Sequence, residues 1–230
     1  MKALAVDTSL TRITIAAKND DKYASLILDI GMRQSEKLLP SIEYILSQVD
    51  LSVKELDYTV LCKGPGSFTG LRLAFSALKA LELSHGIPVY GVDTLEAYSY
   101  AYKSLPMPVL CAVDAKKNRF YVRSFFNDGI IIPDGDYEMN DISEKLKDLN
   151  AEKVFVCGSD AELFIERFKS NDECDKKISE KFISLKSKHD ETENLFTIAE
   201  DMIANKKPAL QDFEGPVYIR ASEAETNLIS

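Results

Sequence analysis

Short apolar runs alternate with amphipathic stretches along the chain, and the same succession occurs twice. In each half the pattern predicts three strands, then a helix, a strand, a helix, a strand and a helix. The first half has these elements at residues 2–9, 12–17, 23–30, 35–49, 58–62, 71–84, 87–92 and 94–104. The second half has them at residues 107–115, 119–126, 130–135, 141–149, 153–159, 161–168, 181–186 and 193–206.

This duplicated order predicts the fold class. Two copies are too few for a solenoid, and each copy contains the elements of one mixed sheet flanked by helices. We therefore expect an α/β protein with two ribonuclease H-like lobes, the plan of the actin-like and Hsp70-like ATPases. The boundary is expected in SLPMP at residues 104–108, which gives an N-terminal lobe at 1–104 and a C-terminal lobe at 105–230.

Composition and charge narrow the classes of function. The 230 residues are 45% hydrophobic and 28% charged, as in ordinary soluble globular proteins, and the formal net charge is −9. This charge argues against autonomous binding of nucleic acid, because contacts with phosphates need clustered Lys and Arg. Any nucleic acid is expected to reach the chain through a partner protein.

The cysteines and the N-terminal run bear on cellular location. The four cysteines contain no CxxC pair and are expected to be buried free thiols: Cys62, Cys111, Cys157 and Cys174. The apolar start MKALAV stops at Asp7, short of a signal-peptide core, and no run approaches the ~20 apolar residues of a membrane span. We expect a cytoplasmic protein without a membrane partner.

The loop GPGSFTGLR, at residues 64–72, stands between a predicted strand and a predicted helix. Unsatisfied amides at a helix N-terminus can bind an anion, but the loop is neither a Walker A motif nor a dinucleotide-binding fingerprint. The alternative is a turn that its glycines permit, with Ser67 or Thr69 capping the next helix. Both interpretations remain open from the residues alone.

Residues at the ends of the two first strands are candidates for nucleotide or phosphate binding. In actin-like ATPases an acid in this place orients hydrated magnesium, and Asp7, Thr8 and Ser9 fit it. Asp114 fits the second such place, but the turn at 115–118 has no glycine to let a phosphate approach closely. The alternative is that Asp7 caps backbone amides at the end of the sheet.

Six stretches together carry a resemblance to a known family: LAVDTS, SEKLLPSIEYIL, GPGSFTGLRLA, PVYGVDTLEA, VDAKKNRFYV and PVYIRASEAE. In this order they resemble the TsaB family, also called YeaZ, closely in the first half and weakly between about residues 127 and 210. The resemblance implies an actin-like fold with an eroded second lobe and no known catalysis of its own. It also implies a complex with TsaD and the ATPase TsaE that transfers threonylcarbamoyl to adenosine 37 of tRNA.

No catalytic or metal-binding residue is expected in this chain. The resemblance implies that TsaD, the catalytic relative, binds its metal through two histidines one helical turn apart, whereas this sequence has only His85 and His189. Family members often have a histidine before LLP, where this chain reads Arg33, Gln34, Ser35 and Glu36. No serine has a nearby histidine to activate it, so peptidase activity is not expected. No cofactor is expected, except for ATP or ADP at a subunit interface.

A partner surface is the favoured function. The predicted helices at 35–49 and 71–84 are rich in apolar residues, and family members use these two helices to pair with TsaD or with themselves. The expected interface residues are Ser35, Glu36, Leu38, Leu39, Ile42, Leu46, Phe68, Leu71, Arg72, Phe75 and Leu78. The alternative is that these residues form the chain's own core.

Three functions therefore remain in view. The first is a non-catalytic subunit that binds TsaD, with a homodimer on the same face when the chain is alone and with tRNA bound only through the complex. The second is a stand-alone actin-like small-molecule kinase or ATPase. The third is a regulatory homodimer without a part in tRNA modification.

Overall fold

The first five strands form one mixed sheet. They are β1 (Lys2–Asp7), β2 (Ile13–Asn19), β3 (Lys22–Leu28), β4 (Tyr58–Gly64) and β5 (Val89–Asp93), in the order β3-β2-β1-β4-β5. The pairs β1–β2 and β2–β3 are antiparallel, whereas β1–β4 and β4–β5 are parallel. This computed structural model describes residues 1–185 and 191–219, except for the side chain of Met32.

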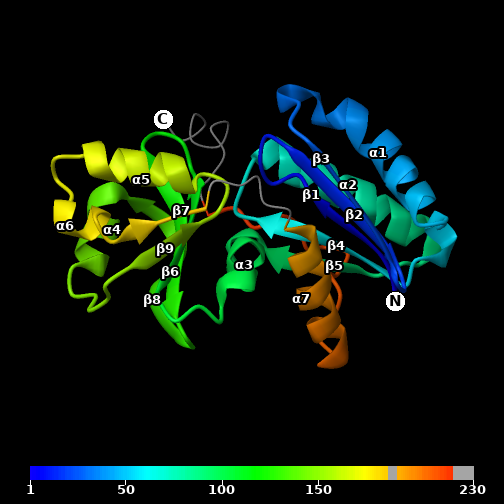
Figure 1. Cartoon of the computed structure of the whole chain (residues 1–230). Coiled ribbons are helices and arrows are strands. Elements are labelled where there is room, and N and C mark those ends of the chain that lie inside the picture. Colours follow the sequence, from blue (N-terminus) through cyan, green and yellow to red (C-terminus); the bar gives the residue numbers. More distant parts are fainter. Residues whose placement is uncertain (186–190, 220–230) are drawn as a thin grey trace. The chain divides into compact units, whose positions relative to one another are not determined.

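Helices cover both faces of this sheet (Figure 1). One face packs against α1 (Gln34–Gln48), which follows the short helix η1 (Gly31–Arg33), and against α2 (Phe68–His85). The helix α7 (Thr192–Ala204) packs on β1, β2, β4 and β5. The remaining helices of this part are η2 (Val53–Glu55) and α3 (Thr94–Ser99). Leu4 and Val6 of β1 point to the α1 and α2 side, as expected from the alternation of side chains along a strand.

The second sheet repeats the topology of the first. It contains β6 (Val109–Asp114), β7 (Arg119–Phe126), β8 (Gly129–Glu138), β9 (Val154–Cys157) and β10 (Phe182–Ile183), in the order β10-β9-β6-β7-β8. Its core includes residues from α4 (Met139–Leu146), α5 (Ala161–Ser170) and α6 (Lys176–Ser179), among them Phe164 and Phe168. The short helix η3 (Tyr100–Tyr102) precedes β6. The predicted order of strands and helices, with two mixed sheets flanked by helices, is confirmed.

The predicted division at residue 104 needs correction. The contacts group residues 1–97 with 191–219 in unit 1, and residues 98–185 in unit 2. The last helix and the segment after it, expected in the domain 105–230, therefore belong to the first unit.

Helix α7 belongs to unit 1 because it packs against the first sheet through specific side-chain contacts. The Phe196 ring lies edge-on to Tyr23 and Tyr58, at centroid distances of 6.3 and 6.5 Å. The Tyr58 hydroxyl donates a hydrogen bond of 3.1 Å to Glu200, which also pairs with Lys18. The Tyr58–Glu200 hydrogen bond joins residues 142 positions apart in the sequence, which a local pattern does not reveal.

Two local predictions are also decided. The four cysteines are free and buried, as expected. Helix α1 begins at Gln34 with Arg33 as its N-cap, one residue before the predicted range 35–49, and Pro40 lies inside the helix. In the described parts of the chain, no helix has the length and apolar character needed to cross a bilayer.

Phe196→Ala tests the attachment of α7. Removing the buried ring is expected to lower the free energy of unfolding by about 3 kcal/mol or more, because a cavity remains between α7 and the sheet. Thr197→Ala, at an exposed neighbour on the same helix, should change it by less than about 0.5 kcal/mol. Chemical denaturation measures both variants, and equal effects would contradict the packing of α7 on unit 1.

Candidate functional site

Two loops meet at the end of β1 in unit 1. The first follows β1 and contains Thr8 and Ser9, and the second is the GPGSFTGLR loop between β4 and α2. The Ser67 amide donates to the Ser9 carbonyl at 2.6 Å, and the Thr8 hydroxyl donates to the Gly70 carbonyl at 2.6 Å. The two backbones are therefore in direct contact.

Glycine is required at two positions of this contact. A Cβ atom at Gly66 would lie 2.4 Å from the Ser9 carbonyl oxygen, and one at Gly70 would lie 1.9 Å from the Thr8 carbonyl oxygen. Both obstacles are backbone atoms, which cannot rotate aside as a side chain can. The glycines of the loop therefore allow the close approach that fixes where α2 begins.

The N-terminus of α2 is capped within the chain. Ser67 is the N-cap, and its hydroxyl accepts a 3.2 Å hydrogen bond from the Gly70 amide. The predicted cap at Ser67 is confirmed. Because the Ser67 and Gly70 amides both have partners inside the protein, the architectural interpretation of this loop is better supported than anion binding.

Asp7 also acts within the chain. Its side chain is buried, and its Oδ1 accepts a 2.8 Å hydrogen bond from the Ser9 amide. This bond is the one expected from an acid that caps the end of the sheet. Thr8 and Ser9 are equally buried. These three predicted residues lie at the end of β1 and in the loop after it, in unit 1, whereas Asp114 belongs to unit 2.

A buried ion pair that the sequence patterns do not reveal lies beside Asp7. Arg12 donates to both carboxylate oxygens of Glu191, at 2.8 and 3.0 Å, and thus fixes the N-terminus of α7. Burial raises the pKa of Glu191 to about 8; the guanidinium of Arg12 opposes this shift and the nearby Asp7 carboxylate adds to it. Burial likewise raises the pKa of the Cys62 thiol, and the Asp7 carboxylate adds to that shift.

Asp114 is held by two cations of its own unit. Lys116 Nζ lies 2.8 Å from one of its carboxylate oxygens, and Arg167 Nη1 lies 3.2 Å from the other. Burial acts to raise the pKa of Asp114, but the hydrogen bonds from Lys116 and the charges of Lys116 and Arg167 outweigh it and lower the pKa. The negative charge of this carboxylate is therefore already balanced by two cations of the same unit.

The turn after Asp114 has an unusual backbone. Lys116, Lys117 and Asn118 have φ values of 62°, 52° and 61°, in the left-handed region that favours glycine. The turn is closed by a 3.0 Å hydrogen bond from the Ala115 amide to the Arg119 carbonyl. The absence of glycine at 115–118 therefore does not prevent a tight turn.

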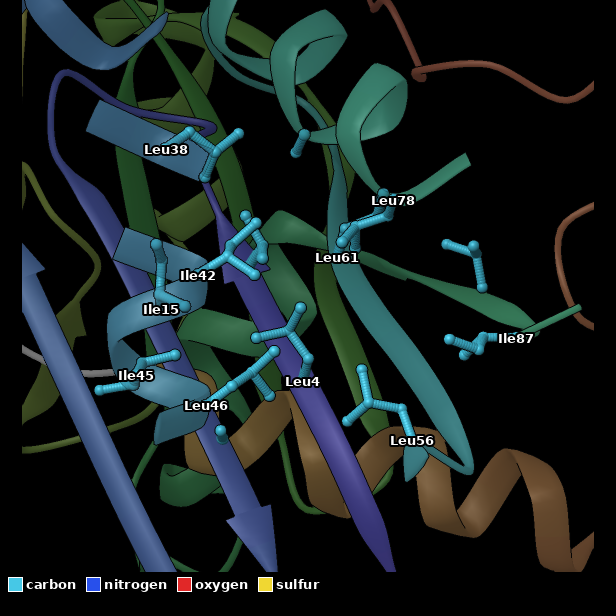
Figure 2. Close-up of a cluster of buried hydrophobic side chains, with 14 of the residues drawn as sticks. Leu4, Ile15, Leu38, Ile42, Ile45, Leu46, Leu56, Leu61, Leu78 and Ile87 are labelled. Carbon is cyan, nitrogen blue, oxygen red and sulfur yellow. The ribbon is translucent and has the colours of Figure 1, made fainter. Parts of the chain in front are cut away.

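The predicted partner residues fall into two groups, and the first group requires a correction. Leu38, Ile42 and Leu46 of α1 and Leu71, Phe75 and Leu78 of α2 are at most 6% exposed and belong to the core of unit 1. Figure 2 shows Leu38, Ile42, Leu46 and Leu78 among the side chains of this core. The first sheet covers this face, so these six residues are not available to a partner in this conformation.

The second group remains on the surface. Ser35, Glu36, Leu39 and Arg72 are exposed, and Phe68 is half-buried. Leu39 is 62% exposed although it is a large apolar residue. Two further apolar residues of these helices, which were not among the predicted interface residues, are also exposed: Tyr44 at 56% and Leu83 at 82%. Each of these two residues lies off the apolar stripe of its helix, and this position is the sequence signal that could have identified it as an exposed apolar residue.

No metal centre is formed by the described residues: in residues 1–185 and 191–219, no three His, Cys, Asp or Glu side chains group as a metal ion requires. His85 is exposed at the end of α2, and its Nδ1 lies 2.7 Å from the Ser84 hydroxyl. The predicted His189 lies outside the described residues.

Gly70→Ala tests the contact between the two loops. The added methyl group meets the Thr8 carbonyl, so the free energy of unfolding is expected to fall by about 2 kcal/mol or more. Gly215→Ala is the matched control, because a Cβ there meets nothing within 4 Å. Thermal unfolding that is unchanged in Gly70→Ala would contradict the close approach.

Glu191→Gln tests the buried carboxyl group. Its pKa is raised from its ordinary value of 4.5 to about 8 in the folded chain, so the folded state binds the extra proton between these pH values. The wild-type free energy of unfolding should therefore fall by a few kcal/mol as the pH rises from 4.5 to 8. The variant should lack most of this fall, as measured by denaturation at several pH values. Parallel curves for the two proteins would contradict the raised pKa.

Comparison with known proteins gives a consistent family. The family model described as "TsaD: tRNA N6-adenosine threonylcarbamoyltransferase" matches residues 31–153. The "tRNA threonylcarbamoyladenosine biosynthesis protein TsaB" of Buchnera aphidicola subsp. Acyrthosiphon pisum is 32% identical over 170 residues, which are 71% of this chain and 76% of that protein.

Two solved structures support the fold. The structure of YeaZ from Pseudomonas aeruginosa matches with a TM-score of 0.74 at 20% identity, covering 95% of this chain and all of that one. A Bacteroides thetaiotaomicron protein of actin-like ATPase fold matches with a TM-score of 0.51 at 11% identity, covering 85% of this chain and 95% of that one. The fold is thus actin-like, and the chain belongs to the TsaB (YeaZ) family of tRNA threonylcarbamoyladenosine biosynthesis proteins.

Proposed function

We propose that this chain is the non-catalytic subunit of a cytoplasmic complex that transfers threonylcarbamoyl to adenosine 37 of tRNA. It binds a TsaD protein through the outer faces of α1 and α2. The observation that carries the proposal is the exposure of Leu39 and Leu83 on these two helices, although the rest of their large aliphatic residues pack inward. Family membership supports the choice of partner and of reaction.

The outer face of α2 has a regular pattern. Five of its exposed residues recur at intervals of three and four, which places them on one stripe of the helix: Thr69, Arg72, Ser76, Ala80 and Leu83. The small side chains of Ser76 and Ala80 in the middle of the stripe allow another helix to approach closely. Arg72 and Leu83 stand near its two ends and offer a charged and an apolar contact.

The outer face of α1 combines apolar and acidic groups. Leu39 is flanked by Glu36 and Glu43, which are three positions before it and four positions after it, and all three are exposed. Such a mixture suits a partner that binds and releases better than it suits a permanently buried core. A homodimer formed by the isolated chain would use the same face and compete with TsaD.

The net charge of the chain and the hydrogen-bonded or ion-paired acidic residues bear on how tRNA and nucleotide enter the proposal. A chain of net charge −9 binds tRNA through TsaD and not by itself. Nucleotide hydrolysis is assigned to TsaE, and any ATP or ADP near this chain lies at a subunit interface. A stand-alone kinase or ATPase is less well supported, because Asp7 caps Ser9 and Asp114 is paired with Lys116 and Arg167.

Leu39→Asp tests the proposal. The exposed position tolerates the charge, so the chain should stay folded, while affinity for a TsaD protein from the same organism falls about tenfold or more. Calorimetric titration measures the affinity, and analysis of tRNA nucleosides from cells that carry the variant measures threonylcarbamoyladenosine.

Two further variants make this test specific. Leu185→Asp, at an exposed leucine of unit 2, should leave the affinity unchanged. Phe75→Asp, at a residue that is 6% exposed, should instead unfold the chain, because it buries a charge in the core. A folded Leu39→Asp chain that binds TsaD with wild-type affinity would reject the proposed surface.

A further inference from the structure

We infer that Arg72, held against the Phe68 ring and the Tyr218 hydroxyl, is the anchor of the partner surface and receives a carboxylate group of the partner protein. One of the two rings, Tyr218, comes from the segment after α7. This inference rests on the proposed function and adds to it a chemical anchor and a second segment of the chain. We call Phe68, Arg72 and Tyr218 the arginine clamp.

The arginine clamp fixes the guanidinium group in one orientation. Arg72 Cζ lies 3.8 Å from the centroid of the Phe68 ring and 6.0 Å from that of Tyr218. Arg72 Nε donates a 3.1 Å hydrogen bond to the Tyr218 hydroxyl, and the two rings are 4.8 Å apart, tilted by 31°. Holding a flexible side chain in advance lowers the entropy that binding would otherwise cost.

The segment after α7 is itself fixed to the GPGSFTGLR loop. The Val217 amide donates a 2.7 Å hydrogen bond to the Lys63 carbonyl, and a Cβ atom at Gly64 would lie 2.4 Å from the Val217 carbonyl oxygen. Farther back, the Leu210 amide donates to the Val89 carbonyl at 2.8 Å, and Lys79 donates to the Leu210 carbonyl at 2.8 Å. Tyr218 is thus placed by backbone contacts of this segment with β5 and with the end of β4.

The charge of Arg72 has no acidic partner in the described chain. Four other arginines form ion pairs with carboxylates: Arg12, Arg119, Arg123 and Arg167. Arg72 contacts the two aromatic rings, and no carboxylate of residues 1–185 or 191–219 forms an ion pair with it. A planar guanidinium with free N–H donors is complementary to a carboxylate, which can accept two parallel hydrogen bonds.

The surroundings favour a protein over RNA as the occupant. Val217, Tyr218 and Ile219 are between 37 and 40% exposed, so the clamp lies next to apolar surface. Arginine and tyrosine beside apolar surface are typical of the energetic centre of a protein interface. RNA phosphates would instead be repelled by a chain of net charge −9. Arg72 also belongs to the exposed stripe of α2 already assigned to the partner.

The experiment is calorimetric titration of the full chain with the TsaD protein, at low and high salt. Arg72→Ala should weaken binding by about tenfold or more, and Arg72→Lys should recover only part of the loss, since lysine lacks the planar fork. Tyr218→Ala should weaken binding by a few-fold to tenfold because it frees the guanidinium. Salt should weaken the wild-type complex more than the Arg72→Ala complex.

Phe213→Ala is the matched control, because Phe213 is an exposed aromatic residue of the same segment outside the clamp. Its affinity should equal that of the wild type, and a loss as large as that of Tyr218→Ala would overturn the inference. So would wild-type affinity in both Arg72→Ala and Tyr218→Ala while Leu39→Asp still weakens binding, a result that would leave the proposed function standing. Absence of binding by the wild type would reject both.

A titration of labelled tRNA with the isolated chain tests whether Arg72 binds an RNA phosphate instead of a carboxylate of the partner protein. The inference predicts the same weak association with tRNA for the wild type and for Arg72→Ala. A loss of tRNA binding in Arg72→Ala, with unchanged affinity for TsaD, would assign the clamp to RNA phosphate and overturn the inference.

Discussion

The contact between the backbones at Thr8–Ser9 and the GPGSFTGLR loop is the constraint on which the rest of unit 1 depends. It requires glycine at residues 66 and 70, because a Cβ atom at either position would overlap a carbonyl oxygen of the β1–β2 loop. The contact sets where α2 begins and how it lies on the sheet. The rotation of α2 in turn determines which residues enter the core and which remain at the surface.

The burial of α1 and α2 separates stability from recognition. The inner stripes of both helices pack with the sheet in one core. These residues stabilise the fold, and they are covered and therefore cannot contact a partner. Their outer stripes carry a few apolar groups and a fixed guanidinium among polar residues. The segment after α7 returns to the same region and contributes Tyr218. Residues from distant parts of the sequence therefore build the surface that we propose meets the partner.

Local features of the fold could be predicted from the sequence, whereas features that depend on distant segments could not. Strand alternation and helical spacing predicted the duplicated order of elements, and Ser67 was recognisable as a cap because capping involves neighbouring residues. The burial of Leu38 and Phe75 was not decided, because periodicity shows that a helix face is apolar but not what covers it. Arg12 and Glu191 are 179 residues apart, and no pattern connected them.

The central claim is that the outer faces of α1 and α2 meet a TsaD protein. Hydroxyl-radical footprinting of the chain, alone and in a mixture with that protein, tests it most directly, since it reports the solvent access of single side chains. The account predicts that Leu39, Leu83 and Tyr218 lose reactivity in the mixture, while the exposed Ile130 of unit 2 keeps it. Unchanged reactivity of Leu39 and Leu83 in a mixture shown to contain the complex would contradict the account.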